Sequence, residues 1–170
     1  MIRAVVGAVG RAQDGVSPWL ACLEADHRAI DDHFAAFGTA LSEGRAEADA
    51  LAAGAAGLRR HIWVEETIHF PPLREAGLFG PVLVMLREHG EIWALLDALD
   101  TDVAAGTSAA RLAQTFAQLE EALEQHNLKE ERILYPAGDQ VLDATVAEAV
   151  RGALSDGLMP ADWVCEMFDR

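Results

Sequence analysis

Two stretches of this sequence carry the same metal-ligating side chains at the same spacing. The segment HIWVEETIHFP starts at His61, and HNLKEERILYP starts 65 residues later at His126. In each, a glutamate, Glu65 or Glu130, follows the histidine at the fourth position. Residues four apart on a helix lie on one face, one turn apart. Each imidazole and its carboxylate can therefore reach a common point, as the ligands of a bound cation do.

A lone histidine precedes each of these motifs. Asp26-His27 and Glu88-His89 are 62 residues apart, and each pair is followed by an isoleucine three positions after the histidine. The chain thus contains two copies of one unit, a helix with a lone histidine followed by a helix with His-x-x-x-Glu. A repeated αα-hairpin of this kind predicts a four-helix bundle with a polar site inside it.

The elements that must position these residues follow from the apolar pattern. Apolar residues recur at alternating steps of three and four, which is typical of helices with one buried face. The predicted helices run from Ser17-Pro18 to about residue 42, from 51 to 68, from Gly80-Pro81 to about 105, and from 112 to 133. Pro71-Pro72 and then Pro136 with Gly138 are expected to end the second and fourth helices.

A shorter helix is expected after the bundle, capped by Asp139 and running from about residue 140 to 154. Trp163 and Phe168 are then available to pack on the bundle. The predicted fold class is all-α, an up-down-up-down four-helix bundle with a short fifth C-terminal helix. We expect residues 1–17 to form a tail, 18–136 the bundle, and 137–170 the C-terminal helix and a tail that packs on the bundle.

The four histidines share one level of the predicted bundle. Each lies eight to ten residues from a proline at the same end, which at about 1.5 Å per residue places all four roughly 12–15 Å from that end. All six residues also fall on apolar stripes. Burying an unpaired glutamate costs several kcal/mol, whereas a metal ion needs ionised carboxylates and neutral imidazoles. The candidate metal ligands are His27, His61, Glu65, His89, His126 and Glu130.

Other readings of these polar residues remain open. A single core histidine is more often satisfied by a neighbouring side chain than by a metal, and the polar residues of a helical interaction module can hydrogen-bond to one another. His33 and His69 fall beside the stripes and are expected on the surface or in hydrogen bonds to a ligand, and a place among the ligands is the less favoured alternative. Glu66 and Glu131 recur together, one residue off the stripe, where hydrogen bonding to a ligand and a solvated face are equally consistent with the sequence.

The number and type of donors indicate which metal would bind. Four histidines and two glutamates exceed the ligand set of one structural zinc and suit two metals bridged by the carboxylates. Imidazole with carboxylate favours iron, with manganese or zinc as substitutes. A ferritin-like di-iron bundle uses Glu-x-x-His motifs, and Glu24-x-x-His27 and Glu66-x-x-His69 have that spacing. The fourth helix has no such motif, so that alternative is weaker.

Composition narrows the classes of partner. The chain has 170 residues and a formal net charge of −15, which opposes binding to nucleic acid or to an acidic membrane. No apolar run reaches the length of about 20 residues that a membrane-spanning helix needs. The two cysteines, Cys22 and Cys165, are far apart and lie in no CxxC motif, so we expect free thiols and a cytoplasmic protein. One disulfide bond is the alternative.

The repeated motifs resemble the hemerythrin-like (HHE cation-binding) family over about residues 18–136. The resemblance implies a hemerythrin-like four-helix bundle whose centre holds two non-heme iron ions with an oxo or hydroxo bridge. The sequence departs from that of oxygen-carrying hemerythrins, which have a fifth histidine one turn from the lone histidine of the third helix. Here Met85 and Trp93 flank His89, and the second carboxylate is Glu130 at spacing four, where the carriers have aspartate at spacing five.

These departures favour a more symmetric site than that of the carriers. One iron would be held by His27 and His61, the other by His89 and His126, with Glu65 and Glu130 as bridges. The predicted function is a protein that binds or senses O₂, NO or peroxide through this centre. The alternatives are an iron-handling or iron–sulfur cluster repair protein, a low-level di-iron oxidase or peroxidase, and a metal-free helical interaction module. We assign no named enzyme activity and no oligomeric state.

Overall fold

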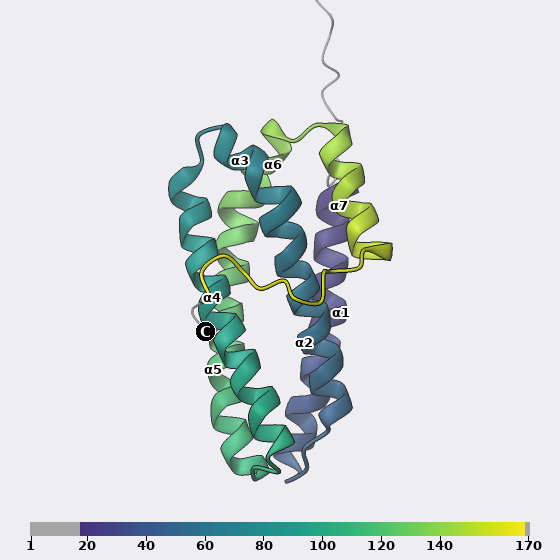
Figure 1. The fold of residues 1–170 in the computed structure, drawn as a ribbon, viewed down its shortest axis with the longest axis vertical. Helices are drawn as coiled ribbons and strands as arrows, with labels where there is room; N and C mark the ends of the chain where they lie inside the picture. The colour runs from purple at the N-terminus through teal and green to yellow at the C-terminus, as the bar shows by residue number, and fades with distance from the viewer. Residues whose placement is uncertain (1–17, 169–170) are drawn as a thin grey trace, which may run out of the picture.

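Four long helices run side by side in the computed structural model, which describes residues 18–168. They are α1 (Pro18–Ser42), α2 (Ala48–Val64), α4 (Phe79–Ala104) and α5 (Ala109–Lys129), and successive helices run in opposite directions (Figure 1). The described residues contain no strand. The predicted all-α up-down-up-down bundle is therefore confirmed. The expected N-terminal tail and the proposed cap Ser17 lie outside the described residues.

Two apolar clusters fill the bundle, one towards each end. The first, at the end with the α1–α2 and α4–α5 turns, includes Phe37, Leu51 and Leu99, all at most 1% exposed. The second, at the opposite end, includes Leu23 and Val82. Full burial of one such side chain contributes about 1.5–3 kcal/mol. The six predicted ligands lie between the two clusters along their helices, so the candidate site is a polar layer across an apolar core.

Gly54 has a structural role in this packing. A Cβ added to Gly54 would lie 2.7 Å from Cε1 of the Phe34 ring on α1. The glycine lets α1 and α2 approach closely around that ring, and both residues are buried. A residue that weakens helix propensity in the sequence is thus required by the contact between helices.

The expectation that prolines end the second and fourth helices is wrong. A π-helical turn, η1 (Glu65–His69), follows α2 directly and leads into α3 (Phe70–Glu75). In the same way η2 (Glu130–Leu134) follows α5 and leads into α6 (Tyr135–Val141). The prolines sit at the first positions of α3 and α6. The wider turn before them changes the hydrogen-bond register, and proline at the first turn of a helical segment lacks only an N–H that would be unpaired there.

The fifth helix, α7 (Ala144–Asp156), begins later than expected. Its cap is Asp143, whose Oδ1 accepts hydrogen bonds from the backbone N–H groups of Thr145 and Val146. Asp139 lies inside α6, so it is not the cap of the fifth helix. Helix α7 packs beside α1, where Val150 and Leu154 join the cluster that contains Leu23 (Figure 1).

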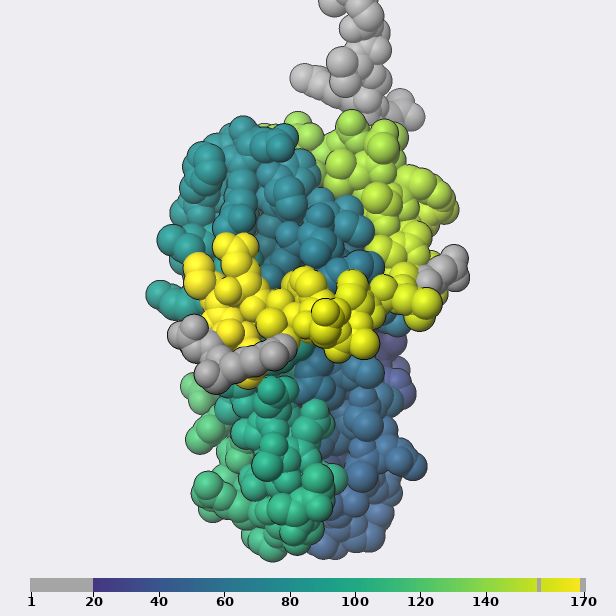
Figure 2. Space-filling view, in the orientation of Figure 1, coloured from purple at the N-terminus to yellow at the C-terminus, as the bar shows by residue number. Residues whose placement is uncertain are grey.

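Residues 157–168 form an irregular segment, which we call the C-terminal strap. It leaves α7 and crosses the face made by α2 and α4 (Figures 1 and 2). The rings of Trp163 and Phe168 lie 5.5 and 6.3 Å from the ring of Trp93 on α4, as the sequence suggested. Among the described residues, no helix combines the length and hydropathy that crossing a bilayer requires.

Candidate metal centre

The six predicted side chains converge on one buried layer of the bundle. Five of them are at most 4% exposed, and the His27 side chain is 11% exposed. Their donor atoms form two groups, and within each group all atoms lie within 4.8 Å of one another. The first group is Glu65, His89, His126 and Glu130. The second group is His27, His61 and Glu130. Glu130 therefore belongs to both groups.

Short distances connect the donor atoms within the layer. Nε2 of His126 lies 3.0 Å from Oε1 of Glu130, and Nε2 of His89 lies 3.3 Å from Oε2 of Glu65. In the second group Nε2 of His27 lies 2.9 Å from Nε2 of His61 and 3.7 Å from Oε2 of Glu130. Each oxygen of Glu130 thus faces a different group, which is the geometry of a carboxylate placed to bridge two cations.

Both glutamates stand at the first residue of a π-helical turn. Glu65 begins η1 and Glu130 begins η2, and both are 0% exposed. A π-turn takes in one more residue than an α-turn and is common at functional sites. Here the extra residue lets each helix present its carboxylate to the layer and then continue towards the second apolar cluster.

The outward nitrogen of three histidines is held by a carboxylate. Nδ1 of His61 lies 2.9 Å from Oδ2 of Asp26, and Nδ1 of His126 lies 3.2 Å from Oε2 of Glu88. Since a carboxylate only accepts, each Nδ1–H donates. That arrangement leaves Nε2 directed at the centre and is typical of metal-binding histidines.

His89 is held in the same way by a residue of its neighbouring helix. Its Nδ1 lies 2.7 Å from Oε1 of Glu66, in η1. Of the two glutamates that the sequence left undecided, Glu66 therefore hydrogen-bonds to a predicted ligand, whereas Glu131 is exposed.

Several inward-facing atoms of the layer lack a hydrogen bond. Both carboxylate oxygens of Glu65, Oε1 of Glu130 and Nε2 of His89 are buried without a partner of acceptable hydrogen-bond geometry, although some lie within 3.3 Å of each other. Leaving buried carboxylate oxygens unpaired is costly. A cation among them would satisfy these atoms, and imidazole with carboxylate is a suitable donor set for iron, manganese or zinc. The residues present fit a metal centre.

The electrostatics of the layer's own side chains are consistent with this fit. Burial alone would lower the pKa of His61 and of His126, but the carboxylates of Glu65 and Glu130 beside them raise each pKa to about 10. Burial and the neighbouring His61 lower the pKa of His27 to about 4. Without a metal, protons on His61 and His126 therefore balance the buried carboxylates, and a bound cation would take over that role.

Two further residues border the layer: His69, whose role the sequence left open, and Tyr135, which the sequence did not single out. His69 is 0% exposed, with Nδ1 3.7 Å from Oε1 of Glu65. The hydroxyl of Tyr135 donates to Oε2 of Glu130 at 3.2 Å. His69 follows Glu65 at the fourth position, a spacing visible in the sequence, whereas Tyr135 enters through the π-turn, which the periodicity did not reveal. His33 is exposed, one of the two positions expected for it.

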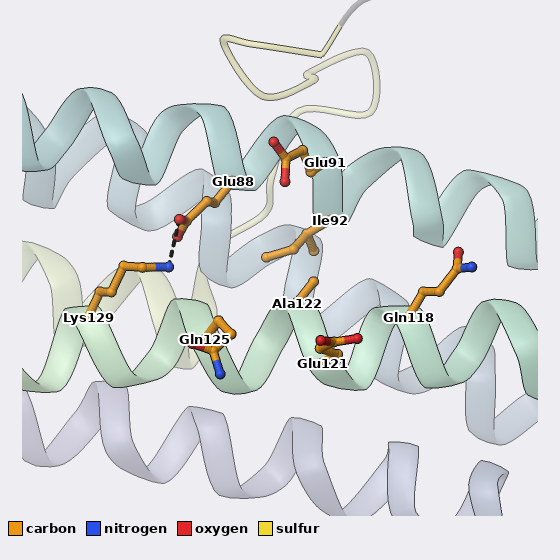
Figure 3. Close-up of a pocket in the computed structure, with 8 residues that line it drawn as sticks. All are labelled: Glu88, Glu91, Ile92, Gln118, Glu121, Ala122, Gln125 and Lys129. Atoms are coloured by element: carbon orange, nitrogen blue, oxygen red, sulfur yellow. Dashed lines mark hydrogen bonds and ion pairs between the residues drawn. The ribbon is translucent and has the colours of Figure 1, made fainter.

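A surface cavity of about 290 Å³ lies between α4 and α5 on the outer side of the layer. Figure 3 shows Glu88 on its wall, joined to Lys129, whose Nζ lies 2.7 Å from Oε1 of Glu88. The other oxygen of Glu88 contacts His126. Glu88 therefore connects the buried layer to a solvent-facing wall.

The fold and the site agree with one family of known proteins. A family model described as the Hemerythrin HHE cation binding domain matches residues 20–138, a range that contains all six predicted ligands. Neither the curated proteins nor the solved structures that were compared include a match.

Proposed function

This chain belongs to the hemerythrin HHE cation-binding domain family, and we propose that it holds two iron ions and uses them to bind or sense O₂ or a related small oxidant such as NO or peroxide. The observation that carries the proposal is the division of the donor atoms into two groups that share Glu130. One group of donors alone would suit a single ion, whereas two groups sharing a carboxylate suit a pair.

The side chains divide between the two positions in the proposal. His27 and His61 serve one ion, His89 and His126 serve the other, and Glu65 and Glu130 are shared. Oε1 of Glu65 lies 3.7 Å from Nε2 of His61 and its Oε2 lies 3.3 Å from Nε2 of His89, so this carboxylate also faces both histidine pairs. With two histidines and shared carboxylates each, neither ion would be fully coordinated by protein, which leaves room for an exogenous ligand.

Two iron ions would supply reversible one-electron chemistry towards O₂, NO or peroxide. The protein's own side chains would exclude water from the ions and orient their ligands. The apolar cluster around Leu23, Phe70 and Leu134 covers one side of the layer and keeps bulk water from it. Three carboxylates, those of Asp26, Glu66 and Glu88, fix the imidazole rings. Tyr135 donates to Glu130 and so orients the shared carboxylate.

Metal analysis of the purified chain tests the proposal. Anaerobic loading with Fe(II) followed by air should give about two irons per chain and a near-ultraviolet absorption that shifts on addition of azide. His126→Ala should lose iron, and His33→Ala is the matched control because His33 is an exposed histidine outside the layer. A wild-type chain that retains no iron, or equal loss in both variants, would refute the proposal.

The response of the reduced protein to air then separates carriage from oxidation. A spectrum that appears with O₂ and disappears when O₂ is removed supports reversible binding or sensing. Prompt oxidation that removing O₂ does not reverse argues against reversible binding and favours an oxidase.

A further inference from the structure

The C-terminal strap contacts the candidate centre through one side chain. Oε2 of Glu66 accepts a hydrogen bond from the backbone N–H of Glu166 in the strap at 2.8 Å, across 100 residues of sequence. Oε1 of the same carboxylate accepts from Nδ1 of His89 at 2.7 Å. A single carboxylate therefore joins the main chain of the strap to a proposed metal ligand.

Other contacts seat the strap on the same spot. Arg74 in α3 pairs with the Glu166 carboxylate at 3.1 Å. The strap also lies so close to α4 that a Cβ added to Gly90 would be 2.5 Å from the backbone oxygen of Met167. Gly90 follows His89 directly, so the absence of a side chain there allows the strap to reach the helix beside the ligand. Cys165 precedes Glu166 in the strap, and its side chain is 1% exposed and packs in the first apolar cluster.

The support that the strap gives is confined to one half of the repeat. Glu131 holds the position equivalent to Glu66 in the second motif, and it is exposed. His61 and His126 are held by Asp26 and Glu88, which belong to the bundle helices themselves. His89 differs from these two histidines. The Glu66 carboxylate that accepts its hydrogen bond is itself held by the strap, which lies outside the four-helix bundle.

We propose that the strap is a positioning element for one metal position: the backbone N–H of Glu166 fixes the Glu66 carboxylate, which holds the His89 ring with Nε2 directed at the centre. The inference rests on the proposed function for the presence of the metals. Carboxylates that orient a metal-binding histidine typically change metal affinity by about 10- to 100-fold when lost. Because coupling between two binding events is reciprocal, occupancy of that position should also hold the strap in place.

A matched pair of variants isolates the backbone donor. Glu166→Pro removes the N–H, whereas Glu166→Ala removes the exposed pair with Arg74 and keeps the N–H. The readout is chelator competition after anaerobic Fe(II) loading of the full-length chain. Glu166→Pro should bind one iron with near wild-type affinity and the second about 10- to 100-fold more weakly, and Glu166→Ala should keep both. If the proline variant retains both irons as tightly as the wild-type chain does, the inference is overturned.

A second pair guards against local effects of proline. Gly90→Ala pushes against the backbone of Met167, and Gly152→Ala in α7 is its control because the added Cβ meets nothing within 4 Å. Gly90→Ala should weaken the second iron in the same way. Suppose that in Gly90→Ala a thiol reagent reaches Cys165 but the affinity for the second iron is unchanged. The strap would then detach without affecting the centre, and the inference would be overturned.

The reverse direction is measured by labelling Cys165. Fe(II) loading should slow the labelling of Cys165 in the wild-type chain but not in Glu66→Ala, because the connection to the strap is then cut. Identical labelling of the wild-type chain with and without bound iron contradicts the coupling. If the wild-type chain binds no iron at all, the proposed function fails, and the metal coupling fails with it. If two irons bind and none of these variants weakens either, the proposed function stands and this inference alone fails.

Discussion

Oδ2 of Asp26 lies 2.9 Å from Nδ1 of His61, and Oε2 of Glu88 lies 3.2 Å from Nδ1 of His126, its counterpart in the second repeat. In both repeats the acid immediately precedes the lone histidine of its helix. The acid orients the histidine of the next helix while the residue after it enters the centre. A basic residue also pairs with each acid, Arg60 at 2.6 Å and Lys129 at 2.7 Å.

Asp26→Asn should weaken iron binding by about 10- to 100-fold, because the amide no longer supplies the negative charge that fixes His61 and increases the basicity of its Nε2. The burial of Asp26 opposes ionisation, but His61 and Arg60 together lower its pKa, so the carboxylate is charged at neutral pH. Competition between the protein and a chelator for Fe(II) measures the effect. Asp32→Asn, an exposed acid on the same helix, should bind as the wild type does. Equal affinities in the two variants would show that Asp26 has no such role.

Removing the metal should lower the thermal stability of the chain. A ligand present at about 100 times its Kd stabilises the folded state by about 2.7 kcal/mol. For a chain of this size, 1 kcal/mol corresponds to about 2–4 °C in Tm, so chelation should lower Tm by roughly 5–10 °C and Fe(II) should restore it. Calorimetry with and without chelator measures the change. His126→Ala removes a ligand of one position only, so its iron-dependent shift should be smaller than that of the wild type, and a shift of wild-type size in that variant would place the stabilising metal elsewhere.

The sequence allowed the helices and the six converging residues to be predicted because both depend on helical periodicity. Steps of three and four determine which face is buried, and equal distances from helix ends determine the level. The buried face and the level of a residue change little when a helix boundary is misplaced by one or two residues. The sequence repeat also gave two independent observations of each. The repeated acid before His27 and before His89 was visible too, but only the structure showed that each acid contacts the neighbouring helix.

The parts that the sequence did not reveal depend on single residues. Pro71 and Pro136 normally stop a helix, and nothing in the pattern indicated that a π-turn would place them at the start of another segment. The strap has no periodicity, so its contact with Glu66 could not be read from residue types. Tyr135 borders the layer because of the local geometry of the π-turn, which apolar spacing does not report.

Gly54→Ala should destabilise the bundle by about 1–3 kcal/mol, because the added Cβ would lie 2.7 Å from the Phe34 ring and must displace it. In an exposed helix the same change stabilises by up to about 1 kcal/mol. Gly152→Ala in α7 is therefore the control, and it should be neutral or stabilising. Urea unfolding followed by circular dichroism measures both. A stabilised Gly54→Ala variant would mean that α1 and α2 do not pack around Phe34 as described.

Cys165 should react slowly with alkylating reagents even in alkaline solution. Burial, and next the nearby Glu66 carboxylate, raise the pKa of its thiol to about 12, so the reactive thiolate is scarce below that pH. In the unfolded chain the thiol ionises near pH 9. The folded state therefore binds the proton more tightly, and the contribution of this group to stability falls as pH rises from about 9 towards 12.

Mass spectrometry of the native protein treated with iodoacetamide measures this difference at pH 8 and pH 9.5. Both cysteines are free thiols, and the partly exposed Cys22 serves as the internal reference. Cys22 should be modified first at both pH values, and Cys165 should approach its rate only in denaturant. Rapid labelling of Cys165 in the folded chain would mean that the strap detaches from Glu66 on the timescale of the reaction. The contacts of Trp163 and Phe168 with Trp93 oppose such detachment.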